Sequence, residues 1–288
     1  MASPFVSVTA LRRELSGATP PAVLDASLVL HPPREDGDYR RESGYPKWLA
    51  GHIPASRHVD MARDFSDPTA PLSFTHPEAQ VVADRLAALG IAADRRVVVY
   101  DGTGMMFASR LWYLLRWIGM DVRVLDGGFA GWKRSGAAVA SGEEAPPVPV
   151  PTWTPSSPRE AWVTKEDLLA RTQRDWRPLV CTLPASGYSG ADPTRHTRRG
   201  HIPGSVNVSS RDLFAPDGTV RGAREIKAAY VGQGITGHEE VLLYCGAGIS
   251  AAAGALTLAE LGVSEVRIYD GSLEEWSAVP ALPLEYGA

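Results

Sequence analysis

Short apolar runs alternate with longer segments of helical periodicity along the chain. The apolar runs that we expect to be strands are residues 23–25, 97–100, 122–125, 179–181, 241–244 and 266–269. Helical periodicity occupies the intervals between them, for example residues 80–89 and 109–117. Continuous apolar strands alternating with helices are typical of parallel sheets covered on both faces, so the pattern predicts an α/β fold.

The same pattern occurs twice at a long spacing. The sequence VVVYDGTG (97–104) reappears as VLLYCGAG (241–248), 144 residues later, and residues 122–128 reappear as 266–272 at the same distance. Gly-His-Ile-Pro at 51–54 returns at 200–203. A period this long indicates duplicated domains rather than a solenoid. We expect three parts, namely a first domain, a stiff proline-rich linker and a second domain at residues 1–145, 146–158 and 159–288.

Composition narrows the class of protein. A net charge of -4 over 288 residues gives no reason to expect nucleic acid or an anionic membrane as a partner. No segment approaches the ~18 uninterrupted apolar residues of a membrane span, and the N-terminus lacks a signal-peptide core. Two cysteines, Cys181 and Cys245, favour a reducing compartment, so a cytoplasmic location is expected. The number of cysteines does not exclude a single disulfide bridge between these two.

Cys245 stands where a predicted strand becomes a predicted helix. The free amides and positive dipole end of a helix N-terminus stabilise an anion, such as a thiolate. Gly246 and Gly248 allow the loop to fold tightly around the sulfur. A buried, inert cysteine is the alternative, but it does not require a glycine-spaced loop. Phosphate-cleaving thiol enzymes place an arginine six residues after the cysteine; Ala251 stands there, which argues against a phosphatase.

The Gly-His-Ile-Pro pairs, the Tyr-Cys-Gly-x-Gly-x-Ser-Ala loop and the closing Asp-Gly-Gly-Phe-x-x-Trp and Asp-Gly-Ser-x-x-x-Trp motifs resemble the tandem-domain rhodaneses. That family comprises the thiosulfate and 3-mercaptopyruvate sulfurtransferases, and the resemblance covers nearly the whole chain. It implies two rhodanese-like domains, each a mainly parallel sheet with helices on both faces. It also implies that only the second domain is catalytic. Asp101 agrees with this, because it occupies the place of Cys245 and cannot hold a sulfur atom.

The resemblance and the loop together predict sulfur transfer. The Cys245 thiolate attacks the sulfur of a small anionic donor, expels sulfite or pyruvate and keeps a persulfide, which a thiol or cyanide acceptor then removes. Loop amides surround the anionic sulfur, so neither a metal nor an organic cofactor is expected. The alternative is a non-catalytic sulfur carrier or redox-sensing binding module. The predicted site residues are Cys245 for catalysis and, for substrate, Gly246, Ala247, Gly248, Ile249, Ser250, Ala251, Arg195 and His196.

The donor is specified less well than the reaction. Thiosulfate enzymes follow their cysteine with arginine and lysine, whereas Gly246 and Ala247 follow here. The neutral loop is more similar to that of mercaptopyruvate enzymes, but their loop serine is Ala247, and their assisting histidine and aspartate fall at about Phe74 and Ala62. Their two carboxylate-binding arginines fall at Gly187 and about His196, with Arg195 one residue away. The sequence therefore favours mercaptopyruvate and leaves thiosulfate open.

Several other side chains are expected to be structural. They are His52, His201, Trp112, Tyr113, Trp117 and Cys181. The basic cluster 195–199 is either a solvated loop or a set of side chains that approach the substrate. In the first half, the bulky residues 105–107 take the place of 249–251, and we expect them to fill the space that a donor would need.

Overall fold

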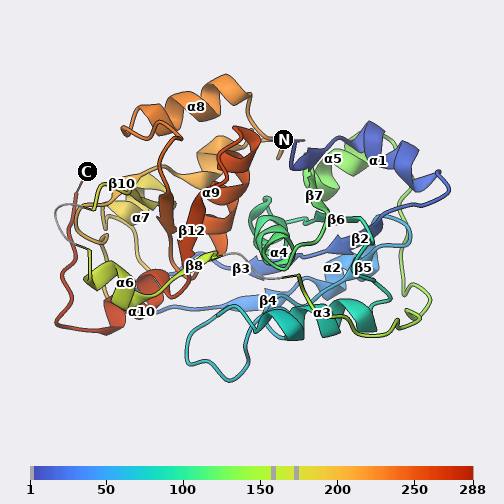
Figure 1. Cartoon of the computed structure of the whole chain (residues 1–288), viewed down its shortest axis with the longest axis horizontal. Coiled ribbons are helices and arrows are strands. Elements are labelled where there is room, and N and C mark those ends of the chain that lie inside the picture. The colour runs from blue at the N-terminus through green and yellow to red at the C-terminus, as the bar shows by residue number, and fades with distance from the viewer. Residues whose placement is uncertain (1–2, 157–159, 172–174, 288) are drawn as a thin grey trace.

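The computed structural model describes residues 3–156, 160–171 and 175–287, and it contains two five-stranded sheets of the same topology (Figure 1). All strand pairs within each of them are parallel. In spatial order the first sheet consists of β1 (Phe5–Val6), β7 (Val122–Leu125), β6 (Val97–Tyr100), β2 (Ala22–Asp25) and β5 (Arg57–His58). In the corresponding order the second consists of β8 (Trp162–Val163), β12 (Val266–Tyr269), β11 (Val241–Tyr244), β9 (Leu179–Cys181) and β10 (Val206–Asn207). The predicted α/β class and the six predicted strands are confirmed.

Helices and one small antiparallel ribbon complete the two domains. The ribbon pairs β3 (Leu28–Leu30) with β4 (Arg41–Ser43). The first domain has the helices α1 (Val8–Leu15), α2 (Tyr45–Ala50), α3 (Ala79–Ala88), α4 (Met106–Trp117) and α5 (Gly128–Arg134). The second has α6 (Lys165–Leu169), α7 (Ala185–Tyr188), the 3-10 helix η1 (Ser210–Leu213), α8 (Ala223–Val231), α9 (Ile249–Glu260) and α10 (Ser272–Ala278).

Strand β11 shows why the apolar runs are continuous. Leu243 packs into the core cluster that contains Leu256 of α9, whereas Leu242 and Tyr244 pack into a second cluster with Trp276 of α10. Because successive side chains of a strand point to opposite faces, both faces of the sheet must be covered for every residue of β11 to be buried. The expectation of a sheet covered on both faces is therefore confirmed.

The proline-rich segment runs in extended form along the first domain. The N–H of Val150 donates to the carbonyl of Ala87 (3.0 Å), and the indole N–H of Trp153 donates to that of Ile91 (3.3 Å). Of the predicted linker, residues 157 and 158 lie outside the described residues. The boundary itself stays a prediction, placed between the last strand of the first sheet, β7, and the first strand of the second, β8.

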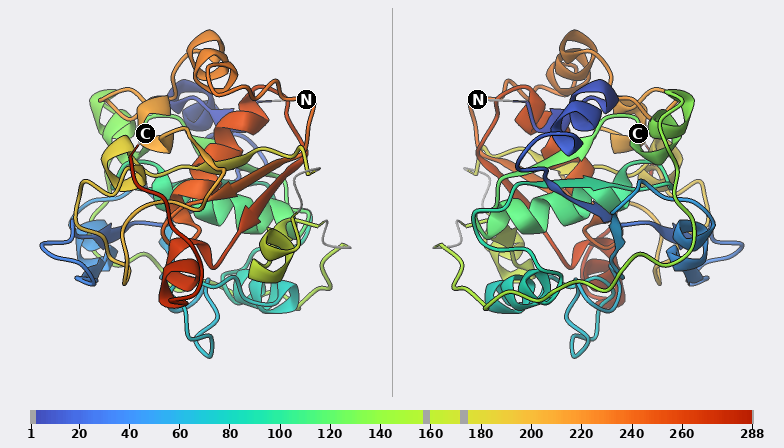
Figure 2. Two further views of the ribbon diagram at one scale, coloured as in Figure 1. Left: turned by 90° about the vertical axis from the view of Figure 1, so that its left-hand side faces the viewer. Right: turned by 90° about the vertical axis from the view of Figure 1, so that its right-hand side faces the viewer.

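The two domains lie side by side along the longest axis, and views along that axis show one in front of the other (Figures 1 and 2). Helices α4 and α9 pack on each other between them. Trp112, Tyr113 and Trp117 are buried, as predicted. The hydroxyl of Tyr113 also donates to the carbonyl of Ala161 (2.7 Å), so this side chain joins the second domain as well as its own core.

Contacts across the domain boundary follow an approximate twofold relation. The carboxylate of Asp126 accepts the N–H of Val220 (2.8 Å), and 144 residues later Asp270 accepts the N–H of His76 (2.7 Å). Arg110 of α4 breaks the symmetry, because its Nη2 lies 2.7 Å from Oδ1 of Asp270. Counted from the start of each helix, the position of α9 that corresponds to Arg110 is Ala253. No cation of α9 faces Asp126, and burial raises the pKa of this carboxyl group.

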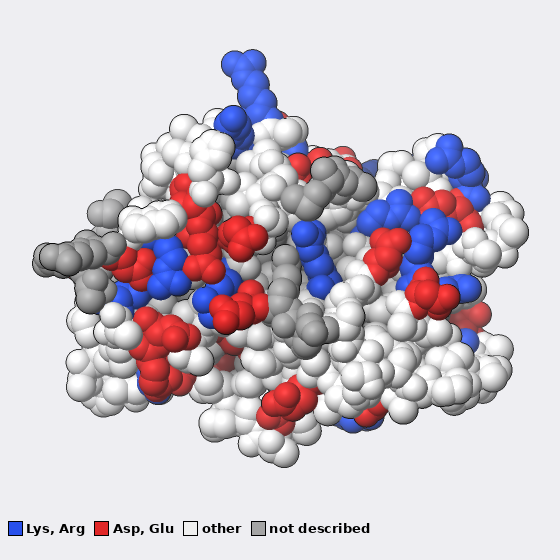
Figure 3. All heavy atoms as spheres, in the orientation of Figure 1, with Lys and Arg blue, Asp and Glu red and all other residues white. Residues whose placement is uncertain are grey.

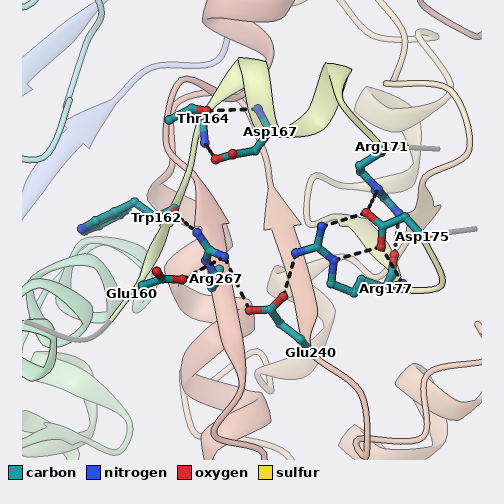
Figure 4. A network of polar contacts seen from close by, with 9 residues as sticks. All are labelled: Glu160, Trp162, Thr164, Asp167, Arg171, Asp175, Arg177, Glu240 and Arg267. Carbon is teal, nitrogen blue, oxygen red and sulfur yellow. Dashed lines mark hydrogen bonds and ion pairs between the residues drawn. The ribbon is translucent and has the colours of Figure 1, made fainter.

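A network of ion pairs holds the end of the second sheet that is opposite to Cys245 (Figure 4). Arg177 and Arg267 both reach Glu240, which immediately precedes β11, at 2.8 and 3.8 Å. Arg177 also pairs with Asp175 and lowers the pKa of that carboxyl group to about 2. Since Cys245 follows β11 and Glu240 precedes it, this network stabilises the sheet away from the predicted site.

The surface and the helices agree with the composition. Acidic and basic side chains are interspersed over the face shown in Figure 3. Across the described ranges, no helix has both the length and the apolar character that a bilayer crossing requires.

The first prediction concerns the buried ion pair. Arg110→Met is expected to lower the free energy of unfolding by about 3–5 kcal/mol, because it leaves the Asp270 carboxylate buried without its cation. Urea unfolding measures the change. Arg134→Met is a matched control: Arg134 also bonds across the boundary, to the carbonyl of Asp217 (2.8 Å), but its side chain is 47% exposed. That variant should lose less than about 1 kcal/mol. Equal losses would show that the ion pair does not hold the domains.

Candidate active site at Cys245

Cys245 lies directly after β11, and the loop turns into α9 within four residues, as the sequence predicts. The residue is 2% exposed. Gly248 has φ +74° and precedes the helix, a left-handed conformation that glycine adopts without strain. The first amides of α9 have no intrahelical acceptor and lie at the positive end of the helix dipole. The local fold therefore places the thiol beside an anion-stabilising helix end.

Ser272 fixes this loop from the neighbouring strand end. Its Oγ accepts the N–H of Cys245 (3.1 Å) and of Gly248 (3.2 Å), and its own hydroxyl donates to the carbonyl of Tyr269 (2.8 Å). The residue is buried with φ +48°, which costs a non-glycine residue about 1–2 kcal/mol. The first-domain counterpart is Gly128, at φ +53°. A strained serine at this position is explained by the two loop amides that its hydroxyl holds.

The carbonyl groups of the loop are held by α10. The N–H of Leu273 donates to the carbonyl of Cys245 (3.1 Å), and the N–H of Glu274 donates to that of Gly246 (2.9 Å). The Asp-Gly-Ser motif marks this segment in the sequence as part of the family resemblance. Its hydrogen bonds to the cysteine loop are visible only in the structure.

The first domain shows what such a loop binds. The carboxylate of Asp101 accepts three backbone N–H groups, from Thr103 and Met105 at Oδ1 and from Ala108 at Oδ2, each at 2.9 Å. The loop is thus an anion site filled by its own side chain. In the second domain, the amides that match those of Thr103 and Ala108 belong to Ala247 and Ala251.

This comparison corrects the predicted alignment of the loops. Helix α4 begins five residues after Asp101, whereas α9 begins four residues after Cys245. Residues 106–108, rather than 105–107, therefore match 249–251. Met105, Met106 and Phe107 are buried as expected, but the group that occupies the loop amides of the first domain is the Asp101 carboxylate.

His196 lies against the cysteine loop. A Cβ atom at Gly246 would be 2.7 Å from its Nε2, so this glycine is required by close approach. The residue is 8% exposed, and its Nδ1 has no hydrogen-bond partner among the described residues. Burial, helped by the charge of Arg195, lowers the pKa of His196 to about 4, so the imidazole is neutral at pH 7.

Arg195 lies between the two domains. Its Nη2 donates to the carbonyl of His31 in the first domain (2.5 Å), and its buried Nε has no partner among the residues described. Burial lowers the pKa of its guanidinium, and the nearby Tyr39 counteracts this. The side chain keeps hydrogen-bonding capacity in the interdomain region.

The other two arginines of the basic cluster are engaged elsewhere. Arg198 donates to the carbonyls of Ser277 (2.8 Å) and Val279 (2.8 Å) in the C-terminal segment. Arg199 pairs with Asp36 at 2.8 Å. In this structure these two side chains are therefore held by other contacts, and approach of the cluster 195–199 to a substrate stays a prediction.

The residues predicted to be structural have that character. The Nδ1 of His52 bonds the carbonyl of Trp48 (2.8 Å), and that of His201 bonds the carbonyl of Tyr188 (2.9 Å). Cys181 is fully buried, burial raises the pKa of its thiol to about 12, and it forms no disulfide with Cys245.

The residues described contain no cluster of three or more histidine, cysteine or acidic side chains arranged to hold a metal ion. A groove of about 870 Å³ lies along β10 and is lined by residues such as His201 and Tyr286. No residue of the loop 245–251 lines this groove, so it is separate from the candidate site at Cys245.

Two parallel-sheet domains of one topology, with a cysteine on an amide-lined loop in the second and an aspartate in the first, define a duplicated α/β thiol protein. The sequence profile described as Rhodanese-like domain matches residues 11–135 and 170–279. The chain therefore belongs to the tandem-domain rhodanese sulfurtransferases.

Named sulfurtransferases are similar over most of the chain. The 3-mercaptopyruvate sulfurtransferase of Escherichia coli is 32% identical over 266 residues, covering 91% of both chains. The mitochondrial thiosulfate/3-mercaptopyruvate sulfurtransferase 1 of Arabidopsis thaliana is 29% identical over 286 residues, covering 91% of this chain and 73% of its own. The crystal structure of SseA from Escherichia coli superposes with a TM-score of 0.80 at 28% identity, over 94% of this chain and 99% of SseA.

The second prediction tests the strained serine. Ser272→Gly should change the free energy of unfolding by less than about 1 kcal/mol, because relief of strain offsets the lost hydrogen bonds. Sulfur transfer should nevertheless fall at least about tenfold, since the loop amides are no longer fixed. Ser272→Ala keeps the strain and loses the bonds, so its unfolding free energy should fall by about 1–3 kcal/mol. Urea unfolding and turnover assays measure both; identical stabilities would contradict this account.

Proposed function

We propose that this protein transfers a sulfur atom from a small anionic donor to a thiol or cyanide through a persulfide on Cys245. The observation that carries the proposal is the Cys245 loop, whose first-domain counterpart holds a carboxylate with its backbone amides. An anionic terminal sulfur needs the same stabilisation, and fixed amides supply it without reorganisation.

The proposed reaction has two steps. The Cys245 thiolate attacks the donor sulfur, and the bond between that sulfur and the rest of the donor breaks, so that its electron pair leaves with pyruvate or sulfite. The amides of Ala247 and Ala251 stabilise the terminal sulfur of the persulfide. An acceptor thiolate or cyanide then attacks that sulfur, and the Cys245 thiolate is restored.

We favour 3-mercaptopyruvate as the donor. Gly246 and Ala247 place no cation beside the thiolate, and Arg198 and Arg199 are engaged in other contacts. Arg195 is then the arginine of the cluster that can meet a carboxylate, through its unpartnered Nε. A dianion whose charge adjoins the reacting sulfur suffers more from a neutral loop than a monoanion whose carboxylate reaches an arginine further away.

The third prediction concerns the nucleophile. Cys245→Ser should abolish sulfur transfer and leave the fold intact, because a serine hydroxyl forms no persulfide and is a far weaker nucleophile at neutral pH. Cys181→Ala is the control, which should keep turnover because that thiol is buried and protonated. Mass spectrometry after donor treatment should find one added sulfur on the peptide that contains Cys245. A persulfide on Cys181 alone would refute the assignment, and loading without repeated turnover would indicate a sulfur carrier.

The fourth prediction concerns the donor. The kcat/KM for 3-mercaptopyruvate should exceed that for thiosulfate, and Arg195→Ala should raise KM for mercaptopyruvate with little change in kcat. Arg199→Ala is the matched control, since its guanidinium is held by Asp36 on the surface. Release of pyruvate and sulfite with cyanide as acceptor measures both donors. A thiosulfate value more than about tenfold higher, roughly 1.4 kcal/mol of transition-state preference, would reverse the assignment of the donor.

A further inference from the structure

Glu274 joins the cysteine loop to the first domain. Its main-chain N–H donates to the carbonyl of Gly246 (2.9 Å), the residue next to Cys245. Its side-chain Oε1 accepts the N–H of Ser73 (3.0 Å) from the first domain. Its other oxygen, Oε2, is buried and has no hydrogen-bond partner among the described residues. A buried carboxyl oxygen is therefore left unsatisfied on the residue whose main chain holds the cysteine loop.

The surroundings of this carboxyl group favour proton exchange. Burial raises the pKa of Glu274, and the hydrogen bond from Ser73 only partly opposes this. The charged and titratable groups that face it from the first domain are Arg41 of β4 and Tyr39, which precedes that strand. A carboxyl group with a raised pKa gives up and takes back a proton closer to neutral pH than an ordinary glutamate does.

A thiol donor gives such a group a role that thiosulfate does not. When the Cys245 thiolate attacks the sulfur of 3-mercaptopyruvate, the C–S bond breaks and its electron pair stays on carbon as the pyruvate enolate. The donor sulfur still carries a proton, whereas the carbon needs one to become the methyl group of pyruvate. One proton must therefore move from sulfur to carbon, and the total charge is unchanged.

Other nearby side chains are poorly suited to move this proton. Ala247 and Phe74 are apolar. The hydroxyl of Ser250 lies 3.1 Å from that of Thr182, to which it is hydrogen-bonded. His196 is neutral, and its lowered pKa makes it a weak base.

We propose that Glu274 is a catalytic residue specific to thiol donors, whose carboxylate takes the proton from the donor sulfur and returns it to the enolate carbon of the leaving pyruvate. This inference rests on the sulfur transfer proposed above and adds a residue to it. Thiosulfate carries no proton on its outer sulfur at neutral pH, and the thiolate displaces sulfite from it without proton transfer. The residue should therefore matter for one donor and much less for the other.

The test is Glu274→Gln, assayed with 3-mercaptopyruvate and with thiosulfate, with cyanide as acceptor in both cases. The glutamine carbonyl can still accept the N–H of Ser73, so the interdomain contact is retained. We expect kcat with mercaptopyruvate to fall by about 10²–10⁴-fold and the ratio of the two donors' kcat values to shift by at least about tenfold toward thiosulfate. Glu275→Gln is the matched control: its carboxylate bonds the hydroxyl of Tyr269 (2.8 Å) and Lys165 (3.0 Å), away from the loop.

The pH profile gives a second readout. Wild-type kcat with mercaptopyruvate should fall as the pH drops through the raised pKa of Glu274, because the protonated carboxyl group cannot accept the donor's proton. Glu274→Gln should lack this acid limb, which a purely structural role would leave in place. Equal losses with both donors, or an unchanged acid limb, would overturn the inference while leaving the proposed sulfur transfer intact. A donor-selective loss in His196→Gln without one in Glu274→Gln would assign the proton transfer to the histidine. A wild-type protein that turns over neither donor would instead refute the proposed function, and this inference with it.

Discussion

The buried ion pair between Arg110 and Asp270 is the contact on which the arrangement of the two domains depends. The guanidinium is 1% exposed, and it also lies over the ring of Trp162 (4.9 Å) and within 3.4 Å of the carbonyl oxygen of Gly248. A charge this deeply buried costs several kcal/mol unless its partner is in place, so the domains must dock in one register. Since Asp270 stands two residues before Ser272, docking also fixes the residue that holds the cysteine loop. The first domain therefore helps to position the candidate site.

Duplication gives the two domains similar loops that are filled in different ways. In the first domain the Asp101 carboxylate satisfies the amides permanently, and Gly128 takes the left-handed position without strain. In the second domain a thiol stands in place of the carboxylate, and in the proposed reaction loop amides meet the charge that develops on sulfur. Ser272 accepts the strain and secures the loop that the carboxylate no longer holds. Relative to the first domain, the second therefore has a strained serine in place of a glycine, and this serine fixes the loop.

The sequence predicts the sheets well because the central strands are short, mostly apolar runs; in β7 and β12 a half-buried arginine, Arg123 or Arg267, is the exception. It predicts the loop register less well. The extra residue between Asp101 and α4 is compensated before β7, so a constant spacing of 144 residues hides it. Arg110 and Glu274 were missed for a different reason. Each acts across the domain boundary, and the packing of α4 on α9 that brings them there has no local signature in the sequence.

In the proposed reaction, recognition of the donor's charge and transfer of its proton fall to different residues. In the proposed reaction the loop is neutral, so the charge of the substrate is met from outside it by Arg195, while Glu274 of α10 supplies a carboxyl oxygen. A donor whose charge adjoins its reacting sulfur brings that charge toward a carboxylate and gains only amide contacts in return. In 3-mercaptopyruvate, carbon atoms separate the carboxylate charge from the reacting sulfur. Charge recognition can then fall to the arginine and proton transfer to the glutamate, with neither group opposing the other at the sulfur.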